Sequence, residues 1–102
     1  MSEGSSEKET RGYRVYGRVQ GVGFRWWTQR TGTALGLGGH VCNLSGGGVE
    51  IHASGSGEGL TALEAALEAG PPMARVDGIE RVDADPRTPE DGFLIEAWGD
   101  GE

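Results

Sequence analysis

The order in which hydrophobic periodicity changes along the chain is the feature that most restricts its fold. Apolar residues alternate with polar ones over residues 13–19, and the spacing then shifts to three and four over residues 24–37. A period of two is typical of a half-buried strand, whereas spacings of three and four indicate one face of a helix. Residues 40–44 and 49–54 resemble two strands of a hairpin joined by the turn-rich sequence SGGG, and the second of them alternates. The first half of the chain therefore predicts the order strand, helix, strand, strand.

The second half of the chain repeats the helix and strand. Leucines at helical spacing over residues 60–67 predict a second helix, and Gly70-Pro71-Pro72 ends it because proline cannot continue a helix. Residues 76–83 and 93–98 are the last strand candidates. This order is that of the split β-α-β, or ferredoxin-like, α+β sandwich. We expect an antiparallel sheet of four to five strands with two helices on one face.

Length and composition favour one domain. The 102 residues suit a domain over residues 11–98, with a disordered polar tail at 1–10 and a short tail at 99–102. The single cysteine, Cys42, cannot form an internal disulfide or a multi-cysteine zinc site, which fits a reducing compartment. The first ten residues hold no apolar run, and no later stretch reaches the roughly 18 apolar residues of a membrane span. We therefore expect a cytoplasmic monomer that does not bind membranes.

Charge is distributed unevenly along the chain. The net charge is −7, but residues 11–49 contain no acid and carry a formal +5, while residues 50–102 carry −10. An acidic protein has little general affinity for nucleic-acid phosphates. A small anion, however, could be attracted to the locally cationic third of the chain.

The segment GRVQGVGFR, residues 17–25, lies between the first predicted strand and the first predicted helix. Glycines there allow positive φ and let N–H groups turn inward, and the helix adds unpaired amides and its positive end. The guanidinium of Arg25 can form two more bonds to the same oxyanion. The Walker motif is excluded because the chain has no Gly-Lys pair. The dinucleotide-binding motif G-x-G-x-x-G is excluded because its third glycine is missing. The segment predicts a phosphoryl-sized anion site, with an ordinary tight turn as the alternative.

These residues also carry a family likeness. Residues 17–25 resemble the acylphosphatase signature, and the resemblance extends from about Arg11 to Trp98. Residues 39–50 are similar to the family segment in which an asparagine ends a strand before a glycine turn and Val-Glu, and residues 70–76 are similar to its second-helix exit. The resemblance implies a ferredoxin-like fold, hydrolysis of small acyl phosphates to a carboxylate and phosphate, and no metal or other cofactor.

By position, the resemblance also implies roles for individual residues. Arg25 would bind the phosphate, and Asn43 would orient the attacking water. The cradling amides would come from the loop of Gln20, Gly21, Val22, Gly23 and Phe24. His40 stands where the family often has tryptophan, and Ser45-Gly46 where Pro-Asp is common. We expect these departures to change loop mobility and substrate preference rather than the chemistry.

The implied reaction requires positioning more than proton transfer. Phosphoryl transfer has a loose transition state with charge on the equatorial oxygens. The carboxylate leaving group has a parent acid with a pKa of about 4, so a general acid is dispensable. Neither Arg25 nor Asn43 can act as a base. We expect the substrate itself or bulk water to accept the proton.

Two other functions stay open at this point. The same cradle could bind a phosphorylated or carbamoyl-phosphate-like ligand without turnover, as in larger multidomain proteins that contain a domain of this type. A nucleic-acid module is disfavoured by the acidic charge and by the lack of an aromatic-rich strand. We interpret His40, His52 and Cys42 as structural or surface residues.

Overall fold

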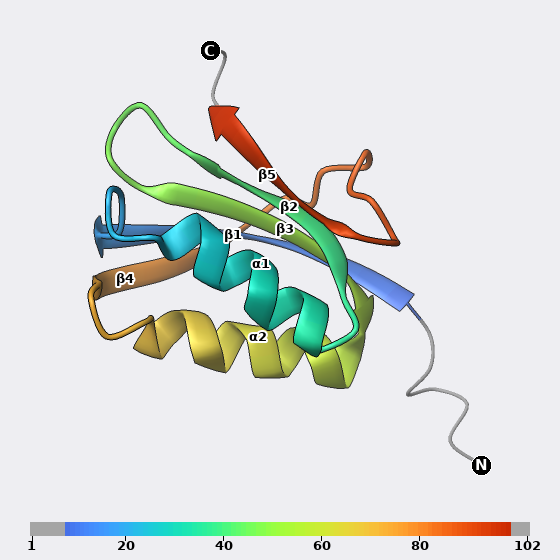
Figure 1. The fold of residues 1–102 in the computed structure, drawn as a ribbon. Helices are drawn as coiled ribbons and strands as arrows, with labels where there is room; N and C mark the ends of the chain where they lie inside the picture. Colours follow the sequence, from blue (N-terminus) through green and yellow to red (C-terminus); the bar gives the residue numbers. More distant parts are fainter. Residues whose placement is uncertain (1–7, 99–102) are drawn as a thin grey trace.

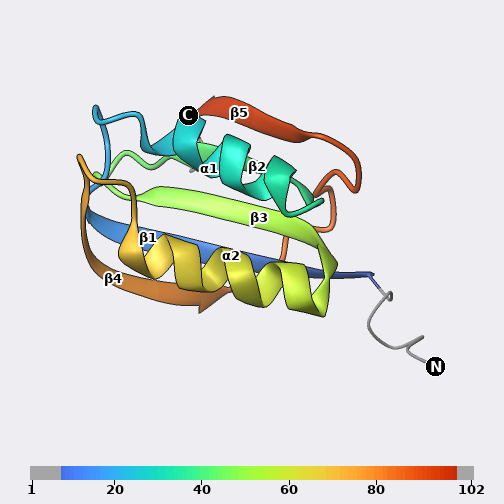
Figure 2. The same cartoon turned by 60° about the horizontal axis from the view of Figure 1, so that its bottom comes forward.

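A computed structural model describes residues 8–98 as a five-stranded sheet with two helices on one face (Figure 1). In chain order the elements are β1 (Lys8–Arg18), α1 (Phe24–Ala34), β2 (Gly38–Asn43), β3 (Val49–Ser56), α2 (Gly57–Ala69), β4 (Arg75–Val82) and β5 (Phe93–Trp98). The strand order is β4-β1-β3-β2-β5. The two helices lie side by side over the sheet in both views (Figure 2). The predicted ferredoxin-like α+β sandwich is therefore confirmed.

The sheet is mixed, because β5 runs parallel to β2. The other neighbouring strands all pair antiparallel. The prediction of an antiparallel sheet is thus wrong at this one edge. The reason lies in the connection over residues 83–92, which leads from β4 at one edge of the sheet to β5 at the other. Periodicity within a strand carries no information about the direction of its neighbour.

The first strand begins earlier than the domain boundary expected from composition. Residues 8–10, which we assigned to the tail, pair with residues 54–56, because β3 continues far enough to offer them partners. The remainder of the predicted tails, residues 1–7 and 99–102, lies outside the described residues. No helix within residues 8–98 has the length and apolar character needed to cross a bilayer.

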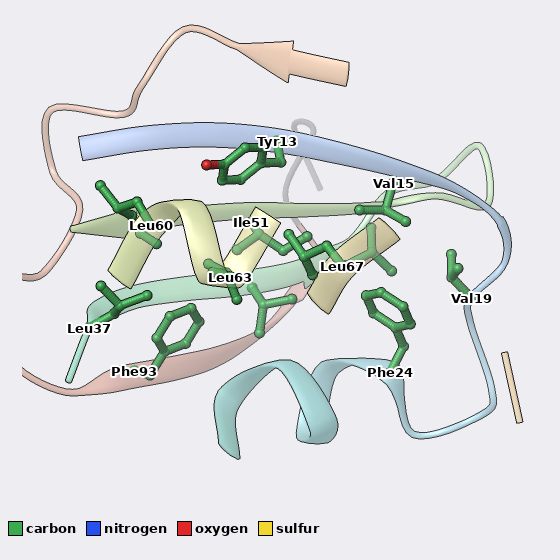
Figure 3. Packing of buried hydrophobic residues seen from close by; sticks show 13 residues of the cluster. Tyr13, Val15, Val19, Phe24, Leu37, Ile51, Leu60, Leu63, Leu67 and Phe93 are labelled. Atoms are coloured by element: carbon green, nitrogen blue, oxygen red, sulfur yellow. The ribbon is translucent and has the colours of Figure 1, made fainter. Parts of the chain in front are cut away.

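The core fills the space between the sheet and the helices (Figure 3). Tyr13 and Val15 of β1 are fully buried there, as are the three leucines of the α2 stripe, Leu60, Leu63 and Leu67. Gly32 lies inside α1 for a reason that the sequence did not reveal. A Cβ at this position would lie 2.5 Å from the ring of Phe93, so glycine lets β5 approach the helix closely. The leucine stripe predicted for α2 is therefore confirmed. The face that the spacing predicted for α1, Trp27, Thr31, Ala34 and Leu35, is only partly buried, and the fully buried residues of this helix are Phe24, Thr28 and Gly32.

A polar network occupies the sheet face opposite the helices. Glu50 accepts hydrogen bonds from Arg14 Nε and from His52 Nε2, each at 2.7 Å. His52 Nδ1 accepts from the backbone N–H of Asp85 at 3.1 Å, which places the His52 proton on Nε2. Burial acts to raise the pKa of the Glu50 carboxyl, but the hydrogen bonds from His52 and Arg14 outweigh it and hold that pKa below its ordinary value. His40 stacks on His52 with ring centroids 5.1 Å apart. The network joins the β4–β5 connection to the central strands.

Candidate active site

The glycine-rich loop leads directly into α1, and the first turn of this helix has free backbone amides. Gly21 and Gly23 both have φ of 77°, and Gly23 is the N-cap of α1. A Cβ at either position would meet nothing within 4 Å, so glycine is needed for the backbone conformation rather than for space. Trp27 N–H donates to Gly23 C=O at 3.0 Å. The amides of residues 24–26 therefore precede the first intrahelical bond and, with the helix dipole, are suited to binding an anion.

Arg25 extends from this first turn toward β5. Its Nη1 donates to the main-chain carbonyl of Glu96 at 2.8 Å. Because a guanidinium has five N–H donors, this bond orients the side chain and leaves donors for a ligand. The first turn of α1 contains no acidic residue, and within residues 8–98 no carboxylate forms an ion pair with Arg25. An unneutralised cation thus lies beside the free amides.

Asn43 is the last residue of β2, and its side-chain oxygen is buried without a hydrogen-bond partner among residues 8–98. Leaving a buried acceptor unpaired costs about 1–3 kcal/mol. In native structures an unpaired buried polar atom calls for an explanation, and one such explanation is a bound water that supplies the missing hydrogen bond. Oδ1 of Asn43 is therefore a candidate acceptor for a reactive water.

A pocket of about 180 Å³ brings these features together. It is lined by Val19, Gly21, Gly23, Phe24, Arg25, Trp26, Asn43 and Ile95. The structure therefore places the two predicted functional side chains, Arg25 and Asn43, around one small hollow. The volume is below the ~300–1,000 Å³ of sites for drug-sized ligands, which suits a single phosphoryl group. No three His, Cys, Asp or Glu side chains of the described chain come together in a way that could hold a metal ion.

Two residues of the predicted cradle, Gln20 and Val22, do not line this pocket. Gln20 Nε2 donates to the carbonyls of Leu44 and Gly48, at 2.7 and 2.8 Å, and so ties the loop to both sides of the β2–β3 turn. Val22 packs against the core. Conversely, Ile95 lines the pocket although nothing in its sequence neighbourhood indicated it. The parallel pairing of β5 with β2, which brings it there, could not be predicted from local pattern.

Packing decides which arginines of the acid-free segment stay unpaired. Arg14 forms an ion pair with Glu50 at 2.7 Å, and Arg11 forms one with Glu9 at 3.1 Å. Among the described residues, the arginines of this segment without an ion pair are Arg18, Arg25 and Arg30. Two of these three lie on α1, and of the three only Arg25 lines the phosphate pocket.

Comparison with known sequences gives a consistent result. The acylphosphatase family model matches residues 11–95. An acylphosphatase of Koribacter versatilis is 49% identical over 88 residues, which cover 86% of this chain and 80% of that protein. An acylphosphatase of Nitratidesulfovibrio vulgaris is 51% identical over 73 residues, which cover 72% of this chain and 73% of that protein.

Solved structures extend the likeness to three dimensions. An acylphosphatase from Coxiella burnetii superposes with a TM-score of 0.78 and 31% identity, over 94% of this chain and 100% of that chain. Full-length HypF in a phosphate- and nucleotide-bound form gives a TM-score of 0.81 and 26% identity, over 94% of this chain but 13% of HypF. Because the family match spans most of the sequence and the fold agrees with it, this chain belongs to the acylphosphatase family.

Proposed function

We propose that this acylphosphatase hydrolyses a small acyl phosphate by in-line attack of a water that Asn43 orients, on a phosphoryl group held by Arg25 and the amides of the 20–24 loop. Family membership supports the overall reaction. The observation that carries the assignment of roles is the buried, unpartnered Oδ1 of Asn43 in the same pocket as an unpaired arginine.

The phosphoryl group is bound by donors that are already in place. Arg25 is held by the Glu96 carbonyl, and its remaining N–H groups can form a bidentate contact with two phosphoryl oxygens. The amides at the start of α1 contact the other equatorial oxygen. Because negative charge accumulates on these oxygens in the transition state, fixed donors stabilise it without reorganisation.

The water is bound from the strand side of the pocket. One of its O–H groups donates a hydrogen bond to Asn43 Oδ1, which leaves an oxygen lone pair directed at phosphorus. As the new P–O bond forms, the bond between phosphorus and the acyl oxygen breaks, and the carboxylate leaves with the electron pair. The second proton passes to a phosphate oxygen or to bulk water. No protein group has to titrate, because the leaving carboxylate is a weak base.

Hydrolysis of acetyl phosphate by the purified protein in the presence of a chelator tests this proposal. Arg25→Ala should lower kcat/KM by about 10²–10³ or more, the loss typical when one donor to a developing oxyanion is removed. Arg18→Ala is the matched control, because it removes another arginine without an ion pair in the described chain and should leave the rate nearly unchanged. A fully active Arg25→Ala enzyme would contradict the assigned role.

A second candidate is a module that binds phosphate or carbamoyl phosphate without turning it over. The likeness to a segment of HypF, a much longer protein solved in a phosphate-bound form, supports it. Calorimetric binding of inorganic phosphate by a protein that hydrolyses neither acetyl phosphate nor carbamoyl phosphate would favour this function. Turnover of either substrate would exclude it.

A further inference from the structure

His40 of β2 takes no part in the proposed reaction, yet it lies between two carboxylates from different segments of the chain. It is 9% exposed and lies on the sheet face opposite the helices, because side chains alternate along a strand and Val41 belongs to the core. Its Nε2 lies 3.5 Å from Oδ2 of Asp85 in the β4–β5 connection, and its Nδ1 lies 3.4 Å from Oε1 of Glu96 in β5. Nδ1 forms no hydrogen bond with any other described part of the chain. Its contact with Glu96 is therefore one of charge.

The protonation state of the His40 ring decides whether both contacts are attractive. A neutral imidazole has one N–H and one lone pair, so one of its nitrogens directs a lone pair at a carboxylate. Only the imidazolium presents an N–H to both carboxylates. The ring of His52, which stacks on His40 from β3, is engaged by Glu50 and by the Asp85 backbone. Arg87 also lines the hollow beside His40, but its side chain is 89% exposed and pairs with Asp85.

Glu96 connects this histidine to the phosphate pocket. Its side chain faces His40, and its main-chain carbonyl accepts the 2.8 Å hydrogen bond from Arg25 Nη1. β5 lies at the edge of the sheet and pairs with β2 alone among the described strands. The register of this pairing shifts directly after Cys42 and Glu96, so the ladder supports Glu96 less than a regular ladder would. A contact with the Glu96 side chain therefore helps to fix the carbonyl that orients Arg25.

We propose that His40 is a positioning residue for the phosphate pocket: its protonated ring holds Glu96, and Glu96 in turn holds Arg25 in place for the phosphoryl group. The inference rests on the proposed function, since it takes Arg25 as the residue that binds phosphate. The contribution of His40 to phosphate affinity should be present when its ring is charged and lost when the ring is neutral. The Glu96 side chain is 47% exposed, so solvent screens the contact, and we expect an effect of about two- to fivefold.

A positive charge at His40 would also attract phosphate over a distance, without any contact with Glu96. The variant Glu96→Gln distinguishes the two explanations, because it removes the carboxylate and keeps the main-chain carbonyl and a side chain of similar size. If His40 acts through Glu96, its loss has no further effect in this variant. If His40 acts by long-range attraction, its loss weakens phosphate binding equally with Glu96 or with glutamine.

The test is the dissociation constant of inorganic phosphate, measured by calorimetry for the wild type, His40→Gln, Glu96→Gln and the double variant. Each is measured at about pH 5.5 and about pH 8.5, where a histidine is ordinarily charged and neutral. Comparing proteins at one pH removes the effect of phosphate's own titration. At the acid pH, His40→Gln should raise the dissociation constant by about two- to fivefold in the wild-type background but not in the Glu96→Gln background. At the alkaline pH it should have no effect in either background.

Glu50→Gln is the matched control. It removes a charged partner of His52 on the same face of the sheet and does not touch Glu96, so it should leave phosphate affinity unchanged at both pH values. An effect of His40→Gln that is equal in the two backgrounds, or absent at the acid pH, would overturn the proposal. If His40→Gln does not fold by circular dichroism, Glu96→Gln and the wild type suffice. The ratio of their dissociation constants, variant over wild type, should be higher at the acid pH, and an equal ratio would overturn the proposal.

Hydrolysis of acetyl phosphate by the same proteins separates this inference from the proposed function. If phosphate binding shows the expected pattern but acetyl phosphate is not hydrolysed, the proposed function fails and the positioning role of His40 stands. If acetyl phosphate is hydrolysed but the pattern is absent, only the positioning role fails.

Discussion

Asn43→Ala is expected to lower activity and to leave stability unchanged or raise it. The side-chain oxygen of Asn43 is buried and has no hydrogen-bond partner in the described part of the chain, so the folded protein bears the cost of desolvating it. In the proposed reaction the same oxygen accepts a hydrogen bond from the attacking water. Alanine removes this acceptor. The reaction should therefore become slower, while the desolvation cost that lowers the stability of the folded protein disappears.

The magnitudes follow from these two roles. Removal of one preorganised hydrogen-bonding group from a reaction centre typically lowers kcat by about 10²–10³, or roughly 2.7–4 kcal/mol in the barrier. KM should change little, because the phosphoryl group keeps its contacts with Arg25 and the loop amides. Removal of an unsatisfied buried acceptor should raise the free energy of unfolding by about 1–3 kcal/mol. The packing contacts that the side chain loses reduce this gain. We therefore expect a melting temperature that is equal to that of the wild type or higher by about 4 °C or more.

Thr28→Val provides the matched control. Thr28 of α1 is fully buried, and its Oγ1 also has no hydrogen-bond partner among the residues that the structure describes, but Thr28 does not line the phosphate pocket. Valine replaces the hydroxyl with a methyl group of similar size, so stability should rise by about 1 kcal/mol with kcat and KM unchanged. Steady-state hydrolysis of acetyl phosphate and thermal unfolding by circular dichroism measure both variants. The reasoning is refuted if Asn43→Ala loses stability by more than about 1 kcal/mol, or if it retains the wild-type kcat.

Three further substitutions test the supporting structure. Gln20→Ala removes both hydrogen bonds to the β2–β3 turn, so we expect a loss of about 1–3 kcal/mol in chemical unfolding and a lower kcat/KM; an unaltered enzyme would show that the loop does not need this contact. Glu50 has a lowered pKa in the folded protein, so its contribution to stability is present above the unfolded-state pKa of about 4.3 and is lost as the pH falls through the lower folded value. The melting temperature of Glu50→Gln should therefore fall less steeply than that of the wild type on acidification below about pH 5, and parallel curves would contradict this. Gly32→Ala places a Cβ against the Phe93 ring and should lower the free energy of unfolding by about 1–3 kcal/mol, despite the better helix propensity of alanine. The double variant Gly32→Ala with Phe93→Leu should recover part of this loss. A single variant more stable than the wild type would disprove the close contact.

Most of the fold was predictable because it depends on local pattern. Alternation in β1 and the leucine stripe of α2 predicted which side chains would face the core, and these side chains are buried. The glycines of the loop indicated positive φ, and Gly21 and Gly23 both adopt it. Such features follow from the conformational preferences of single residues and their near neighbours, which a sequence displays directly.

The candidate site was only partly predictable. Arg25 and Asn43 were identified from the motifs that carry the family resemblance, and the structure brings both to one pocket. The sequence did not indicate that Glu96 would hold Arg25 through its backbone, or that the Gln20 side chain would fasten the loop to the next turn. Backbone carbonyls are present at every residue, so no residue type marks the one that a distant side chain will reach.

The sequence by itself determined the order of the elements, the buried faces of β1 and α2, and a glycine loop that leads to an arginine at a helix start. The tertiary structure alone decided the parallel placement of β5, the arginines that stay unpaired, and the isolation of Asn43 Oδ1. The physical reason is the range of the interactions involved. Periodicity and φ preference act over a few residues, whereas strand pairing, ion pairing and burial of a single atom depend on groups that meet only when distant segments pack together.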